Sequence, residues 1–138
     1  MASRISNLIK PLCAFAVMAL AASCATSDTA RNSSAEGEAR LAAMLEGRTA
    51  GEPRSCISAS VDSRLKIIDR TAVVYDAGRT IYVARPENPQ SLDTQDVLII
   101  NRFGSQLCKQ DVIRTADRTL GFTTGIVFLG DFVPYTRP

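Results

Sequence analysis

Hydrophobic and polar positions divide the chain into three parts. An uninterrupted apolar run covers residues 12–22, and residues 25–40 contain no large apolar side chain. From about residue 54, short runs of β-branched and aromatic residues alternate with turn-forming residues. This pattern predicts a targeting segment, a polar connecting segment and a small β domain.

The first part has the layout of an export signal. Arg4 and Lys10 precede the apolar run, which is shorter than the roughly 20 residues that a membrane-spanning helix needs. A basic start followed by a short apolar run is typical of a signal peptide, which we place at residues 1–23.

The end of this signal resembles the lipobox of bacterial lipoproteins. Residues 20–24 read LAASC, with small residues ahead of Cys24. The resemblance implies cleavage before Cys24 and acylation of this residue with palmitate-type chains, and several chains on one residue anchor a protein firmly. Ala25 stands where a signal for retention in the inner membrane would place Asp, which implies the outer membrane, on its periplasmic side. Ordinary cleavage after Ala25, giving a soluble periplasmic protein, is the alternative.

The polar segment, residues 24–40, is predicted to be a disordered tether because it cannot bury enough apolar surface to offset its ordering entropy. A short helix is predicted over residues 35–46, where Leu41, Met44 and Leu45 share one face. The β domain with its leading helix then covers residues 41–138.

Short strands are predicted throughout the last part of the chain. The clearest signal is a hairpin, in which residues 72–75 and 80–84 flank a loop that contains Gly78. Further candidate strands are residues 56–59, 65–69, 97–100, 110–116 and 125–129 and the segment around Pro134, with a surface loop over residues 86–95. The fold class is therefore mainly β, a small antiparallel sandwich or partly open barrel with one short N-terminal helix.

The predicted signal peptide divides the four cysteines into three groups. Cys13 leaves with the signal, and Cys24 is the lipidation site. Cys56 and Cys108 remain, and an exported protein meets an oxidising compartment, so we expect them to form a disulfide. Two separate buried thiols are the alternative.

Composition and charge exclude some functions. A formal charge of +2 is too small for a nucleic-acid-binding domain, and it disappears when Arg4 and Lys10 are removed with the signal. The chain has no His, which excludes Ser-His-Asp and Cys-His catalysis. We expect no catalytic, cofactor-binding or metal-ligating residues.

Acidic and basic side chains were considered as possible sites. The candidate carboxylates are Asp93, Asp96, Asp111, Asp117 and Asp131, which we interpret as solvated or turn-capping groups. Asp131 has apolar neighbours, and a buried carboxylate bonded to backbone amides explains such a position better than catalysis does. The basic residues Arg64, Lys66, Arg70, Arg79 and Arg85 alternate with acidic ones, which favours a self-paired surface. Tyr75, Tyr82 and Tyr135 are expected in the core or at its rim.

Three segments outside the signal are similar in sequence to other proteins. They are residues 49–56 (TAGEPRSC), residues 107–111 (LCKQD) and residues 129–135 (LGDFVPY). Over about residues 41–136 the chain is similar to a family of small uncharacterised bacterial lipoproteins with a Cys-bearing domain. The resemblance supports an exported β domain with a disulfide and implies no catalytic residue.

These observations predict a lipid-anchored cell-envelope protein that contacts the membrane and serves as a non-enzymatic binding or structural module, with an envelope protein as a possible partner. A small periplasmic enzyme or ligand-binding protein that uses Asp and Arg residues is the alternative. A third hypothesis is an inhibitor or chaperone-like factor that presents the loop at residues 86–95.

Overall fold

The computed structural model describes residues 25–59, 65–101 and 104–138. The predicted signal peptide, Cys13, Cys24 and Arg64 lie outside these residues. The described elements are α1 (Ala25–Leu45), β1 (Thr49–Ala50), β2 (Cys56–Ser58), β3 (Leu65–Ile68), β4 (Ala72–Asp76), β5 (Thr80–Pro86), the 3-10 helix η2 (Pro89–Ser91), β6 (Asp96–Ile100), β7 (Gln106–Cys108), β8 (Ile113–Asp117), β9 (Thr123–Val127) and β10 (Leu129–Thr136). None of the described helices is long and apolar enough to span a membrane.

The largest sheet has five antiparallel strands in the order β1-β10-β5-β4-β3. Its centre is the hairpin of β4 and β5, which confirms the strongest prediction from the sequence. Tyr75 pairs with Tyr82 across this hairpin, and Asp76 Oδ1 accepts a hydrogen bond from the amide of Gly78 in the turn. β-branched residues that face both sides of these strands explain why the sheet forms here.

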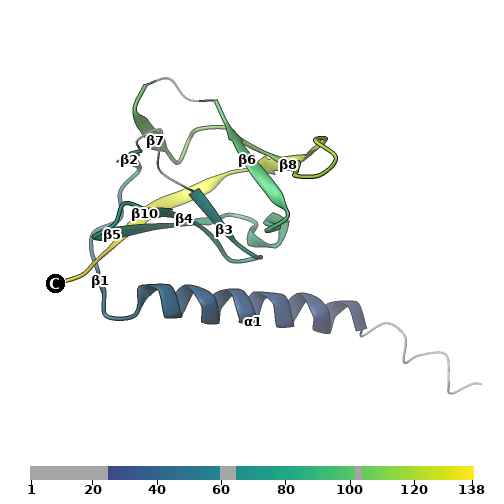
Figure 1. Ribbon diagram of the computed structural model, residues 1–138, viewed down its shortest axis with the longest axis horizontal. Coiled ribbons are helices and arrows are strands. Elements are labelled where there is room, and N and C mark those ends of the chain that lie inside the picture. Colours follow the sequence, from purple (N-terminus) through teal and green to yellow (C-terminus); the bar gives the residue numbers. More distant parts are fainter. Residues whose placement is uncertain (1–24, 60–64, 102–103) are drawn as a thin grey trace, which may run out of the picture.

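The other strands form a three-stranded sheet, β6-β8-β9, and a two-stranded ribbon, β2-β7 (Figure 1). They cover one face of the large sheet, and between them lies the main core. Its buried residues are Ile57, Ala59, Val73, Tyr75, Ala84, Leu92, Leu107, Ile113, Val127, Leu129 and Phe132. The fold is mainly β and antiparallel, as predicted, with a sandwich arrangement, and the described strands form no closed barrel.

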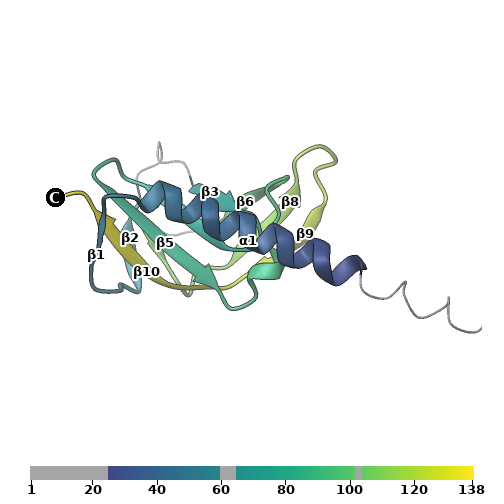
Figure 2. The ribbon, with the colours of Figure 1, turned by 90° about the horizontal axis from the view of Figure 1, so that it is seen from below.

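Helix α1 lies across the opposite face of the large sheet (Figures 1 and 2). Leu41 inserts into a second core with Ile68, Ala72, Val74, Ile81 and Val83, and Met44, Leu45 and Tyr135 pack at its edge. The large sheet is therefore buried on both faces, which explains the continuous apolar runs in β4 and β5.

The prediction of a disordered tether over residues 24–40 is wrong for residues 25–40, which are helical, and the predicted helix over 35–46 is the end of a longer one. The segment is rich in Ala, Glu and Arg, which favour helix even where there is no apolar face. The helix can continue through this polar stretch because Leu41 and Met44 fix its C-terminal part to the sheet. The lack of large apolar residues explains why most of this segment is exposed, but it does not imply a disordered backbone.

Candidate functional site

Cys56 and Cys108 form the predicted disulfide, with an S–S distance of 2.01 Å. The two residues are directly opposite each other in the β2-β7 ribbon, and their Cα atoms are 4.0 Å apart. Next to them, Ile57 pairs with Leu107, and both side chains are buried in the main core. The disulfide therefore joins two short strands and holds their apolar residues in the core.

Asp131 lies beside this disulfide and not in the interior. Its Oδ1 is 2.8 Å from Lys109 Nζ and accepts a hydrogen bond from Ser55 Oγ at 3.1 Å. The ammonium group of Lys109, helped by the Ser55 hydroxyl, lowers the pKa of this exposed carboxyl group. The prediction of a buried Asp131 bonded to backbone amides is wrong: the side chain ties β10 to the residues that flank the two cysteines.

The other candidate carboxylates have structural partners. Asp111 accepts the amide hydrogen of Cys108, Asp93 that of Gln95, and Asp117 those of Thr119 and Leu120. These contacts confirm the interpretation as turn-capping groups. Asp96 differs, because it is buried and its Oδ2 lies 2.7 Å from the hydroxyl of Thr124.

The expected self-pairing of basic residues holds for some of them. Arg85 forms two hydrogen bonds with Glu38 of α1, at 2.5 and 2.8 Å, which lower the pKa of Glu38 and raise that of Arg85. Arg70 lies 3.9 Å from Asp69. Lys66, by contrast, has no ion pair with another described residue. The three tyrosines belong to the core or its edge, as expected, with Tyr75 and Tyr82 in ring contact.

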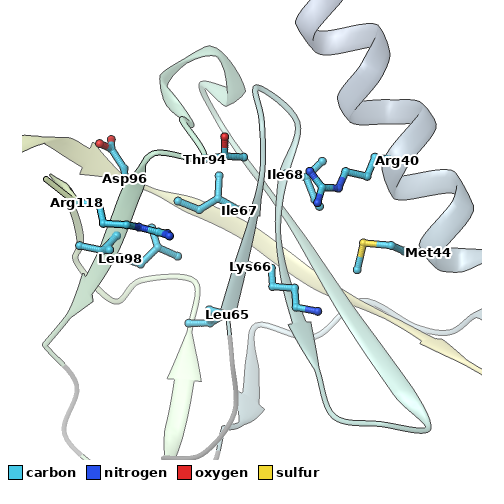
Figure 3. Close-up of a pocket in the computed structure, with 11 residues that line it drawn as sticks. Arg40, Met44, Leu65, Lys66, Ile67, Ile68, Thr94, Asp96, Leu98 and Arg118 are labelled. Atoms are coloured by element: carbon cyan, nitrogen blue, oxygen red, sulfur yellow. The ribbon is translucent and has the colours of Figure 1, made fainter.

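A cleft of about 710 Å³ lies at the edge strand β3 (Figure 3). Its lining residues are Arg40, Met44, Leu65, Lys66, Ile67, Ile68, Thr94, Asp96, Val97, Leu98 and Arg118. The cleft arises from the topology: β3 ends the large sheet and β6 ends the three-stranded sheet, and no described strand joins the two edges.

The walls of the cleft combine apolar and basic groups. On the side that faces β6, Leu65, Ile67 and Leu98 are half-buried, and the side chain of Arg118 extends beside Leu98 (Figure 3). On the side that faces α1, the cleft is lined by Arg40, Met44 and Lys66 (Figure 3). None of the three cations forms an ion pair within the described part of the chain. Such a surface can hold an apolar chain and bind an anionic group next to it.

Asp96 and Lys66 are candidates from the sequence, but no sequence pattern places them at the same site. Arg40 and Arg118 are not among the candidates from the sequence. These residues come from α1, β3, β6 and the end of β8, so no local spacing links them. In the sequence, Val97, Leu98, Ile99 and Ile100 form one apolar run, and this run does not indicate which side chains line a cleft. The continuous apolar run at residues 97–100 is typical of a strand buried on both faces, but Val97 and Ile99 are 37% and 43% exposed.

The described residues contain no group of three or more Cys, Asp or Glu side chains that could hold a metal ion. No protein-family model, curated protein or solved structure matches this chain. The similarity to small bacterial lipoproteins therefore stays a prediction from the sequence, and the cleft has to be interpreted from its own chemistry.

Proposed function

We propose that the chain is a lipid-anchored protein of the cell envelope that faces the periplasm, and that it is a non-enzymatic module whose cleft binds an amphiphilic anion. The anchor is supported by residues 1–24, which lie outside the described residues, with their signal-like run and Cys24. The binding activity is supported by the cleft between β3, β6 and α1.

The single observation that carries the binding proposal is an uncovered apolar wall beside cations that form no ion pair with any described residue. Leu65, Ile67 and Leu98 keep part of their apolar surface in contact with water, so covering it is favourable. Arg118 beside them offers a guanidinium group, which binds carboxylates or phosphates through paired hydrogen bonds. An acyl chain that ends in a carboxylate or phosphate would cover the apolar wall and bind Arg118. The volume of the cleft, about 710 Å³, lies in the ordinary range for ligand pockets.

The positions of the carboxylates favour binding over Asp-based chemistry. Asp111 and Asp131 both lie at the disulfide, where they bond to Cys108, Ser55 and Lys109. Neither of them lines the cleft. Asp96 does line it, and its Oδ2 accepts a hydrogen bond from the hydroxyl of Thr124 at 2.7 Å. The loop at residues 86–95 is held against the fold by Leu92, whose side chain is buried and whose carbonyl accepts the amide hydrogen of Arg70. A loop held in this way is less suited to insertion into a partner than the projecting loop of an inhibitor.

The cleft is tested with a photoactivatable long-chain fatty acid added to membranes that contain the full chain, followed by mass spectrometry of labelled peptides. The acid should label peptides of β3 and β6. Arg118→Ala should reduce this labelling by roughly tenfold, because a charge-assisted hydrogen bond is lost. Arg79→Ala, in the β4–β5 turn, is the matched control and should change nothing.

A photoactivatable alcohol of the same chain length has no anionic group, so it tests binding to the apolar wall independently of binding to Arg118. It should label the same strands in the original chain and in Arg118→Ala. Absence of labelling in β3 and β6, or labelling of these strands that Arg118→Ala leaves unchanged, contradicts the proposed binding. The anchor is tested separately by the intact mass of the membrane-extracted chain, and a mass without acyl groups contradicts it.

A further inference from the structure

Exposed large apolar side chains gather in one region of the described structure. All of them lie between residues 97 and 128, in the three-stranded sheet and the segments next to its strands: Val97, Ile99, Val112, Leu120, Phe122, Ile126 and Phe128. The most exposed is Leu120, at 73%, and Phe122 is 55% exposed. Both belong to the loop between β8 and β9.

Hydrogen bonds hold this loop in a fixed shape. Asp117 Oδ1 accepts the amide hydrogens of Thr119 and Leu120, and the carbonyl of Asp117 accepts that of Gly121. Gly121 has a φ of +73°, a conformation that favours glycine, and the amide of Asp117 closes the loop on the carbonyl of Phe122. The backbone amides of Asp117, Thr119, Leu120 and Gly121 are thus bonded within the loop, while the side chains of Leu120 and Phe122 are exposed.

The loop lies at the same end of the molecule as the start of α1, as both ribbon views show (Figures 1 and 2). The direction of α1 is fixed by buried Leu41 and by the contact of Glu38 with Arg85 of β5. Cys24, the predicted site of lipidation, directly precedes this helix. An anchor at Cys24 would therefore bring this end of the fold toward the membrane.

We propose that Leu120 and Phe122 insert into the interfacial layer of the bilayer that holds the anchor. This inference rests on the proposed lipid-anchored state. Arg118, at the base of the loop, is exposed and unpaired within the described residues, so it suits anionic headgroups, while the carboxylate of Asp117 is occupied by backbone amides. Because Arg118 also lines the cleft, this orientation places that end of the cleft at the lipid surface.

A bilayer fits this feature better than a protein partner. Two side chains on a loop cover far less than the roughly 800 Å² per partner of a stable protein interface. Insertion next to an existing anchor requires much less, because the anchor keeps the loop at the surface at a high effective concentration. Weak insertion of two apolar side chains is then sufficient to fix the orientation of the molecule.

The absence of Trp from the chain allows a direct test. Phe122→Trp in the full chain, reconstituted in phosphatidylethanolamine and phosphatidylglycerol vesicles, supplies the sole Trp. Its emission should shift to shorter wavelength, and bromine-labelled lipids should quench it. The matched control is Ala77→Trp, an exposed position in the β4–β5 turn. This turn is at the other end of the molecule, where the carbonyl of Arg79 accepts a hydrogen bond from the amide of Arg137, close to the C-terminus (Figure 1).

Emission from Phe122→Trp that matches Ala77→Trp, without quenching, overturns the proposal. The intact mass of the same sample reports acylation independently. An acylated chain with unshifted Trp emission leaves the anchor standing and removes the loop contact. A shifted emission in a chain without acyl groups supports the contact and removes the anchor.

Discussion

Gly130 and Asp131 show how one extra residue changes the direction of a side chain. Leu129 pairs with Pro86 and Phe132 with Ala84, so two residues of β10 face the single residue Arg85 of β5. This β-bulge interrupts the alternation of inward and outward positions along β10, so the apolar neighbours of Asp131 did not indicate the direction of its side chain. The side chain consequently points to Ser55 and Lys109, and the LGDF segment noted in the sequence is the bulge itself.

Gly130→Ala is expected to destabilise the fold by about 1–3 kcal/mol, the usual cost of overpacking. An added Cβ would lie 2.7 Å from the carbonyl oxygen of Arg85, a backbone atom that cannot move without disturbing the sheet. Urea denaturation of the full chain measures the free energy of unfolding. Gly125→Ala is the control, since its Cβ would meet only the Thr115 hydroxyl, at 3.4 Å. Equal stability of the two variants contradicts this account of the bulge.

At the scale of the element, helix α1 depends on its contact with the sheet. Apart from Leu41, most of its described surface is polar and exposed, which is why composition indicated disorder. Gly37 is buried on the sheet side, where its lack of a Cβ allows the helix to approach the carbonyl of Asp69 and the side chain of Thr71. A helix of this kind is stabilised mainly by docking and less by its intrinsic propensity.

Gly37→Ala should destabilise the chain even though Ala favours an isolated helix by up to about 1 kcal/mol. The added methyl group would overlap Asp69 and Thr71, so the helix must move away from the sheet. Circular dichroism during thermal denaturation should show a lower midpoint. Ala39→Gly, at an exposed position, measures the propensity effect alone. A higher midpoint for Gly37→Ala would falsify close docking at this point.

At the scale of the whole molecule, the disulfide closes the main core. It joins the β2-β7 ribbon across 52 residues, and the closed segment contains β3, β4, β5 and β6. The ribbon is short and supplies Ile57 and Leu107 to the core, so it depends on this covalent link more than a longer pair of strands would. The cleft is also a property of the whole molecule, since it lies where two sheets end without joining.

Replacing both Cys56 and Cys108 by Ser should lower the free energy of unfolding by about 4 kcal/mol, the chain-entropy estimate for a closed segment of 52 residues. Urea denaturation with and without a reductant provides the measurement. The reductant should destabilise the original chain to a similar extent and leave the double variant unchanged. An unchanged midpoint in the double variant would show that the ribbon does not need the bond.

The sequence by itself determined the mainly β fold, the β4–β5 hairpin and the pairing of Cys56 with Cys108, because these depend on local alternation, turn residues and a count of cysteines. Only the tertiary structure decided the helical state of residues 25–40, the outward direction of Asp131 and the cleft. The physical reason is shared by all three. A docked helix, a β-bulge and a gap between two sheet edges result from contacts between residues far apart in the chain, and periodicity along the chain does not report such contacts.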